Sequence, residues 1–75
     1  MNNTRKKSLR KSIYYLDLAR EIIDTCNDEE SDYRDNMPEN LQDSDKYNAA
    51  DEACDAMDEA ISNIDDITSA IHDIL

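Results

Sequence analysis

Apolar residues recur every seven positions through the second half of the chain, and no other feature constrains the fold as strongly. One row contains Tyr47, Cys54, Ile61, Thr68 and Leu75, and a second row contains Ala50, Met57, Ile64 and Ile71. A repeat of this kind is typical of a helix that packs along one side against another helix. We call this packed side the seam. The sequence therefore predicts a long helix over residues 45–75 and a partner helix beside it.

A third apolar row widens this stripe beyond a two-row seam. It contains Ala53, Ala60, Ile67 and Ile74. A broad stripe is expected when a helix contacts more than one neighbour, as in a helical bundle. The chain also has only 75 residues, and small domains bury a small share of their surface on folding. We therefore expect a homodimer that forms a four-helix bundle.

The first half of the chain has the same period with more polar interruptions. One row contains Leu9, Leu16, Ile23 and Met37, and beside it we place Ser12, Ala19, Cys26 and Tyr33. Pro38 is the only proline and the chain has no glycine, so the sequence contains one strong helix breaker. We predict a single all-α domain, an antiparallel two-helix hairpin, with a flexible N-terminus at 1–4, a helix at 5–35, a turn at 36–44 and a helix at 45–75. Asp43 or Ser44 is the expected N-cap of the second helix.

Antiparallel neighbours in a hairpin have residue numbers with a constant sum, and a sum of 80 matches apolar positions with apolar positions. This register places Cys26 opposite Cys54 near the turn and stacks Tyr33 on Tyr47. In a reducing compartment we expect the two cysteines to be free thiols that pack as small apolar groups, although their pairing would allow a disulfide.

Charge is divided unevenly along the chain. It has 19 acidic and 8 basic residues, a net charge of −11, and five of the basic residues lie within residues 5–11. In the register above, this block lies beside Asp65, Asp66 and Asp73, which would offset positive charge at a helix N-terminus. The net charge disfavours direct binding to nucleic acid or to an anionic membrane, and it favours a basic protein partner.

Motifs for catalysis or cofactor binding are missing from the sequence. His72 is the only histidine, and Cys26 and Cys54 lack the spacing of a zinc site. Without glycine there is no phosphate-binding loop or EF-hand loop. Carboxylates on an exposed helical face lack the desolvation that tunes a general acid. We expect no enzyme activity, no cofactor and no metal.

Hydrophobic segments also limit the expected location. No apolar run approaches the roughly 20 residues of a membrane-spanning helix. The basic start of the chain is not followed by the apolar stretch of a signal peptide. We therefore expect a cytoplasmic protein.

Acidic doublets repeat every seven residues on the second helix, away from its seam. The candidate partner-binding residues are Asp51, Glu52, Asp55, Asp58, Glu59, Asp65 and Asp66, with a second candidate patch of Asp17, Glu21 and Asp24. Neither Lys nor Arg follows Lys46, whereas ordinary exposed helices mix both signs. Regular negative charge on a rod is similar to that of a nucleic-acid backbone. The alternative is that the acidity serves only solubility.

The turn and the second helix resemble a group of small helical-hairpin proteins from bacteriophages and mobile elements. The resemblance rests on the turn sequence Met-Pro-Glu-Asn-Leu-Gln, from Met37 to Gln42, followed by Ser44, Tyr47 and the acidic heptads. It implies a phage context, in which small acidic proteins often inhibit host defence nucleases. It carries over no site residue.

These observations predict an inhibitor of anti-CRISPR type. It would bind a basic nucleic-acid-handling host protein, a defence nuclease such as a CRISPR effector, by charge mimicry of nucleic acid. The main alternative is a coiled-coil structural or interaction module. The salt dependence of binding distinguishes the inhibitor from the coiled-coil module, because a charge-driven complex weakens with ionic strength. A weaker alternative is a regulator that contacts DNA through residues 1–11, against the repulsion of 19 carboxylates.

Overall fold

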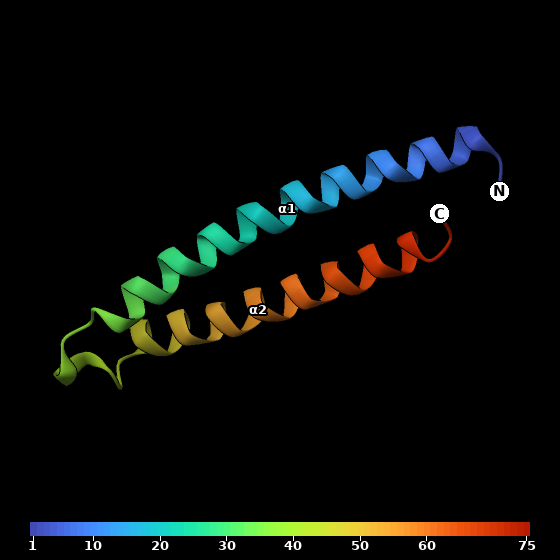
Figure 1. Ribbon diagram of the computed structural model, residues 1–75. Helices are drawn as coiled ribbons and strands as arrows, with labels where there is room; N and C mark the ends of the chain where they lie inside the picture. The colour runs from blue at the N-terminus through green and yellow to red at the C-terminus, as the bar shows by residue number, and fades with distance from the viewer.

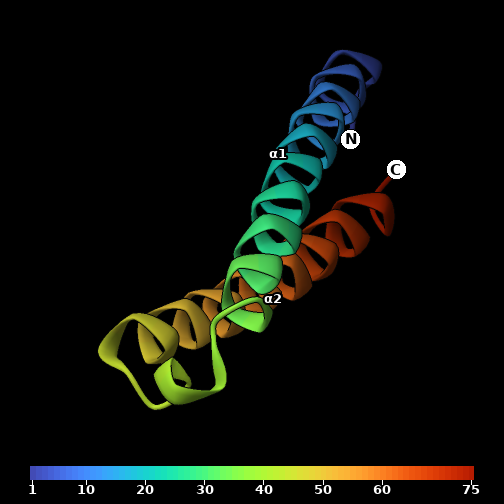
Figure 2. The ribbon, with the colours of Figure 1, turned by 90° about the vertical axis from the view of Figure 1, so that its left-hand side faces the viewer.

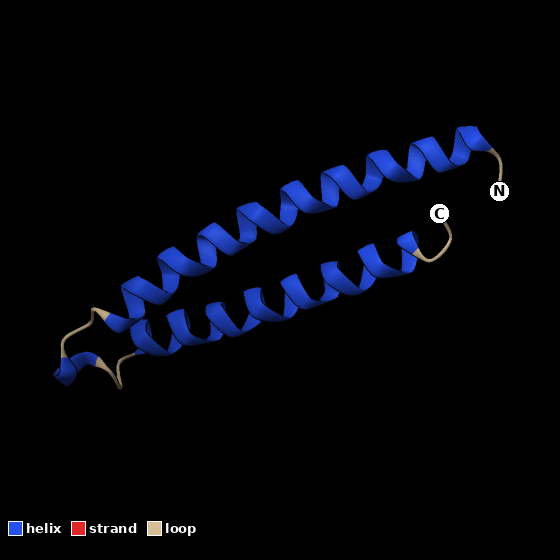
Figure 3. Ribbon diagram, in the orientation of Figure 1, coloured by secondary structure: helices blue, strands red, loops and turns tan.

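The chain folds into two antiparallel helices joined at one end by a short turn (Figure 1). The computed structural model describes all 75 residues. Helix α1 spans Asn3–Asp35, helix α2 spans Asp45–His72, and a short 3-10 helix at Glu39–Leu41 lies between them. There is no strand (Figure 3). The molecule is a rod of 59 × 15 × 13 Å, which confirms the predicted all-α hairpin.

Local side-chain chemistry sets the ends of the helices. The Asn2 side chain accepts a hydrogen bond from the backbone N–H of Arg5, so α1 begins within the segment expected to be a flexible N-terminus. The Ser44 hydroxyl accepts a hydrogen bond from the N–H of Tyr47 and caps α2, as predicted. Pro38 lies outside both helices, in extended backbone, and α1 ends three residues before it.

Contacts between the helices fix a register that differs from the expected one. Four side-chain pairs are in contact: Arg20 with Asp65, Asn27 with Asp58, Ser31 with Cys54, and Arg34 with Asp51. The residue numbers of each pair add to 85, so the expected sum of 80 is wrong. The difference of five residues displaces one helix along the other by about 7.5 Å.

The seam of α1 explains this difference. The row of Leu9, Leu16, Ile23 and Met37 is half-buried, as predicted. The row beside it contains Ile13, Arg20, Asn27 and Arg34, whereas Ser12, Ala19, Cys26 and Tyr33 lie one residue away from it. Polar side chains occupy three of these four seam positions because each has a hydrogen-bonding partner on α2. Apolar matching alone could not identify them.

The cysteine and tyrosine pairs that we expected do not form. A shift of one residue turns a side chain by about 100° around the helix. Cys26 is therefore exposed, while Cys54 is buried and its sulfur lies 3.4 Å from the hydroxyl oxygen of Ser31. Tyr33 is likewise turned outward and does not stack on Tyr47. The one aromatic pair joins the exposed Tyr14 and Tyr15, with ring centres 5.6 Å apart.

The N-terminal end of α1 extends past the end of α2. In the observed register His72, the last residue of α2, is level with Ile13. The residues before Ile13 therefore have no counterpart on α2, and Figure 1 shows the blue end of α1 protruding. Asp65 and Asp66 are level with Arg20 and Ala19 rather than with the basic residues, and none of the five basic residues within 5–11 forms an ion pair within the chain. We call residues 3–11 the basic end.

The interior of the rod is very thin. Only four residues are buried: Ile13, Asn27, Ala50 and Cys54. The helices also cross at an angle, as Figure 2 shows, so their contact is a narrow line rather than a broad core. A single hairpin of this kind leaves most of its apolar side chains partly in contact with water.

Candidate binding surface

The first carboxylate of each acidic doublet on α2 contacts α1. The Asp51 carboxylate accepts a hydrogen bond of 3.0 Å from Arg34, and Asp58 accepts one of 2.7 Å from the amide of Asn27. Asp65 accepts two, of 2.7 and 3.2 Å, from the guanidinium of Arg20. We call these three pairs the polar ladder. Three of the predicted partner-binding residues thus help to hold the hairpin together.

The polar ladder changes the pKa values of its charged members. The hydrogen bonds from Arg20 lower the pKa of the Asp65 carboxyl, and Asp65 in turn raises the pKa of Arg20. The charges of Asp24 and Asp17 also raise the pKa of Arg20. The pKa of Arg34 is raised mainly by its hydrogen bond to Asp35. The carboxylates of Asp65 and Asp35 are exposed and the two arginines are half-buried, so water screens each pair and it contributes little to stability by itself.

The lowered pKa of Asp65 predicts a loss of stability in acid that Asp65→Asn removes. The pKa of an unfolded Asp is about 3.9, so the stabilisation is complete above that pH and is lost as pH falls through the lower folded pKa. We therefore expect wild type to have a higher Tm than Asp65→Asn from about pH 7 to pH 5, and the difference to vanish towards about pH 2. Thermal melts followed by circular dichroism measure this.

Asp66→Asn is the matched control for that experiment, because Asp66 is exposed and has no ion pair. Both substitutions remove one negative charge and relieve the same general repulsion within the chain. Near pH 7, Asp66→Asn should therefore have a Tm at or above that of wild type, whereas Asp65→Asn should have a lower one, so the two effects differ in sign. A Tm difference for Asp65→Asn that stays constant down to about pH 2 would show that the pair is not formed in solution.

The second carboxylate of each doublet points away from α1. Glu52, Glu59 and Asp66 are exposed and form no hydrogen bond or ion pair within the chain, and Asp73 continues the same spacing at the end of α2. We call these four residues the outer row. Neighbouring members are seven residues apart, or about 10.5 Å along the helix. Asp73 was missing from the predicted site because it lacks a doublet partner, although its spacing was visible in the sequence.

The remaining candidates divide between two sides of the rod. Asp55 is exposed on α2 and unpaired. Asp17 and Asp24 are exposed on α1 and lie near Arg20, so the structure gathers them beside Asp65 at the polar ladder. Glu21 lies further around α1 and is not part of that group. The predicted second patch is therefore split.

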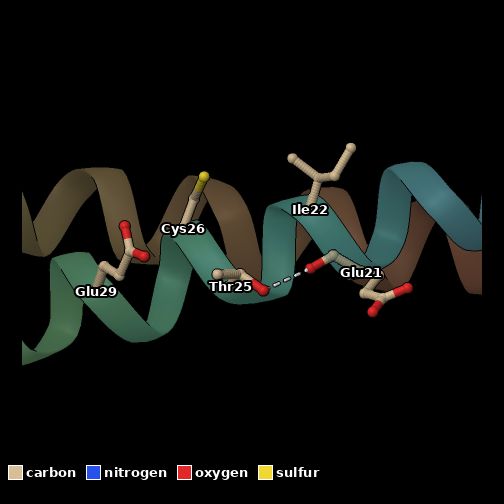
Figure 4. A pocket seen from close by; sticks show the side chains of 5 residues that line it. All are labelled: Glu21, Ile22, Thr25, Cys26 and Glu29. Atoms are coloured by element: carbon tan, nitrogen blue, oxygen red, sulfur yellow. Dashed lines mark hydrogen bonds between the residues drawn. The ribbon is translucent and has the colours of Figure 1, made fainter.

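Glu21 lines a shallow depression on the outer surface of α1. The other lining residues are Ile22, Thr25, Cys26 and Glu29 (Figure 4). A single helix forms this depression, and the Thr25 hydroxyl donates its hydrogen bond to the backbone carbonyl of Glu21. The depression is open, so it offers a ligand little enclosure.

Two further properties of the rod are relevant to its function. No group of three or more His, Cys, Asp or Glu residues is arranged to hold a metal ion. Neither helix combines the length and the apolar character needed to cross a membrane. The chain matches no protein-family model, no curated protein and no solved structure.

Proposed function

We propose that this chain is a non-enzymatic, cytoplasmic, phage-type inhibitor that binds a basic nucleic-acid-handling host protein, such as a defence nuclease, by charge mimicry of nucleic acid. The outer row carries this proposal. It presents four carboxylates on one face of a helix, and none of them has a cationic partner within the chain. A groove lined with Lys and Arg supplies the complementary charge and would attract such a rod over a distance.

The charge density of the rod favours one kind of groove. A net charge of −11 over 59 Å gives about one negative charge per 5 Å, compared with about 3.4 Å along the axis for one strand of a duplex and about 1.7 Å for both strands. Members of the outer row, about 10.5 Å apart, match roughly every third phosphate of one strand. The rod is thus closer to a single strand than to a duplex. We propose a target that holds single-stranded nucleic acid.

Salt-dependent capture tests this proposal. The immobilised protein is exposed to host lysate at about 50 mM salt, and bound proteins are eluted as the salt is raised to about 500 mM. We expect a basic nucleic-acid-binding protein whose affinity falls at least about tenfold between 50 and 200 mM salt. Adding the hairpin should then displace a labelled single-stranded oligonucleotide from that protein. A partner that remains bound at 500 mM salt and keeps its oligonucleotide would contradict mimicry.

The alternative function, a coiled-coil interaction module, is favoured by a different observation. Several large apolar side chains remain about half-exposed, among them Tyr33, Ile67 and Ile74. Docking through such residues depends on apolar contact and is little affected by salt. In that case, the captured partner should resist the salt gradient.

A further inference from the structure

One long side of the hairpin carries apolar or small uncharged residues from both helices. The row on α1 contains Ser12, Ala19, Cys26 and Tyr33, and the row on α2 contains Ala53, Ala60, Ile67 and Ile74. Facing pairs such as Ala19 with Ile67 have numbers that add to 86, within one residue of the observed register, so the two rows lie level. We call this surface the apolar flank. It contains no charged residue among its eight positions.

The apolar flank lies on the side opposite the polar ladder. On each helix the flank row comes one residue before a seam row. On α2 the flank row lies three residues after the seam row of Ala50, whereas the ladder carboxylates lie four residues after the seam row of Cys54. Steps of three and of four residues turn in opposite directions around a helix, so the two sets lie on opposite edges of the seam. The hydrogen-bonded pairs of the polar ladder therefore line one edge of the interface between α1 and α2, and the other edge is exposed to solvent. The exposed fractions there are 50% for Tyr33, 49% for Ile67 and 53% for Ile74.

The exposed area of the chain is large for its mass. A compact monomer of 8.6 kDa would expose about 4,700 Å², whereas this rod exposes 5610 Å². The excess of about 900 Å² is close to the roughly 800 Å² that each partner buries in a stable complex. One long side of a rod of 59 × 15 × 13 Å also has an area of roughly 800 Å². The flank is therefore large enough for a stable interface.

We propose that a second copy of this chain docks on the apolar flank in an antiparallel arrangement and completes a four-helix bundle. Charge selects this direction. Residues 1–16 contain five basic and no acidic residues, whereas residues 28–45 contain eight acidic residues and one basic residue. An antiparallel pair places each basic end beside the acidic turn of its partner. A parallel pair would place the two basic ends together and repel.

A two-fold axis perpendicular to the long axis of the rod allows both the apolar contact and the charge pairing, and it uses the same surface of each copy. It brings the flank of one copy against the same flank of the other, and it forms the two charge contacts at the two ends of the bundle. The outer row and the polar ladder lie outside this interface. The dimer therefore does not depend on the proposed function and leaves the outer row of each copy free.

The outer surface of α1 is a poorer docking face, even though Ile22 is 65% exposed. Only one helix contributes to it, and the carboxylates of Glu21 and Glu29 flank Ile22 and Cys26 (Figure 4). Covering that face would remove charged groups from water without giving them a partner. Ile22 lies one helical turn from Cys26 of the apolar flank, so it is not a suitable control. Leu18, which is 39% exposed on the side of α1 opposite its seam, provides the control for Ile67.

Sedimentation equilibrium tests the interface with Ile67→Glu and Leu18→Glu. Wild type at about 100 µM should have twice the 8.6 kDa mass of one chain. Ile67→Glu buries a carboxylate and should weaken the dimer at least about 100-fold, while Leu18→Glu should remain dimeric. Circular dichroism checks that both variants keep their helices. A monomeric wild type, or dissociation by Leu18→Glu but not by Ile67→Glu, would overturn the proposal.

Carbodiimide cross-linking of the wild-type protein tests the orientation and needs no variant. This reagent joins a lysine to a carboxylate that it contacts. We expect links from Lys6 or Lys7 to Glu39 or Asp43, identified by mass spectrometry and lost at about 1 M salt. Such links must join two copies, because these residues lie at opposite ends of a 59 Å rod. Links between copies from these lysines to Asp73 alone would indicate a parallel pair and overturn the arrangement.

Discussion

Replacing three carboxylates of the outer row, as Glu52→Lys, Glu59→Lys and Asp66→Lys, is expected to weaken binding to the captured basic target by at least about 100-fold. Each substitution turns an attraction to a target Lys or Arg into a repulsion. None of the three residues belongs to the polar ladder, so the hairpin should keep its helicity. Titration of the labelled target at about 50 mM salt measures the loss, and circular dichroism checks the fold.

The matched control changes the same amount of charge on α1, as Asp17→Lys, Glu21→Lys and Asp24→Lys. Both triple variants alter the net charge by six. Because Asp17 and Asp24 lie near Arg20 of the polar ladder, circular dichroism must show that the control also keeps its helices. We expect the affinity of the control for the target to fall by less than about tenfold, because the control changes only the overall electrostatic field of the protein. Equal losses in the two variants would mean that the target responds to net charge alone and that the outer row is not a site.

Replacing Ile13 with alanine is expected to lower the free energy of unfolding by about 2–4 kcal/mol. Ile13 is the only large apolar side chain that is buried, with 9% of its surface exposed. A chain of this length has a total stability of about 4–11 kcal/mol, so the substitution removes a large share of it. Urea denaturation followed by circular dichroism at a fixed protein concentration measures the change.

Ile22→Ala is the control for that prediction, because the same side chain is removed from an exposed position of the same helix. We expect a change within about 0.5 kcal/mol. Comparable losses of unfolding free energy for the two variants would show that α1 does not pack on α2 through the side that contains Ile13.

Sequence patterns predicted the helices and the turn because the signals for these elements are local. The seven-residue rows of α2, the Ser44 cap and the break at Pro38 each depend on a few neighbouring residues. The register is a property of two distant segments. Apolar matching selected the wrong row of α1, since Ala19 and Cys26 look more suitable for a seam than Arg20 and Asn27.

The candidate site was predicted in part for the same reason. Glu52, Glu59 and Asp66 lie on the exposed face, as expected from the helical period. Asp51 and Asp65 share that acidic pattern, but they are paired with Arg34 and Arg20. These two ion pairs depend on the register between the helices and therefore could not be predicted from the sequence of one helix alone. A search for opposite charges with a constant sum of residue numbers would have found both pairs.

Cleavage of one peptide bond in the protruding basic end would change the net charge of the molecule. Helix α1 has 33 residues and α2 has 28, so the open end of the rod consists of α1 alone. The backbone there is held by α1 alone, without contacts from α2, so local unfolding can expose it to a protease. Five trypsin-type recognition residues lie within residues 5–11. Cleavage after Lys11 would remove all five and leave 19 acidic and three basic residues, which makes the net charge −16 in place of −11.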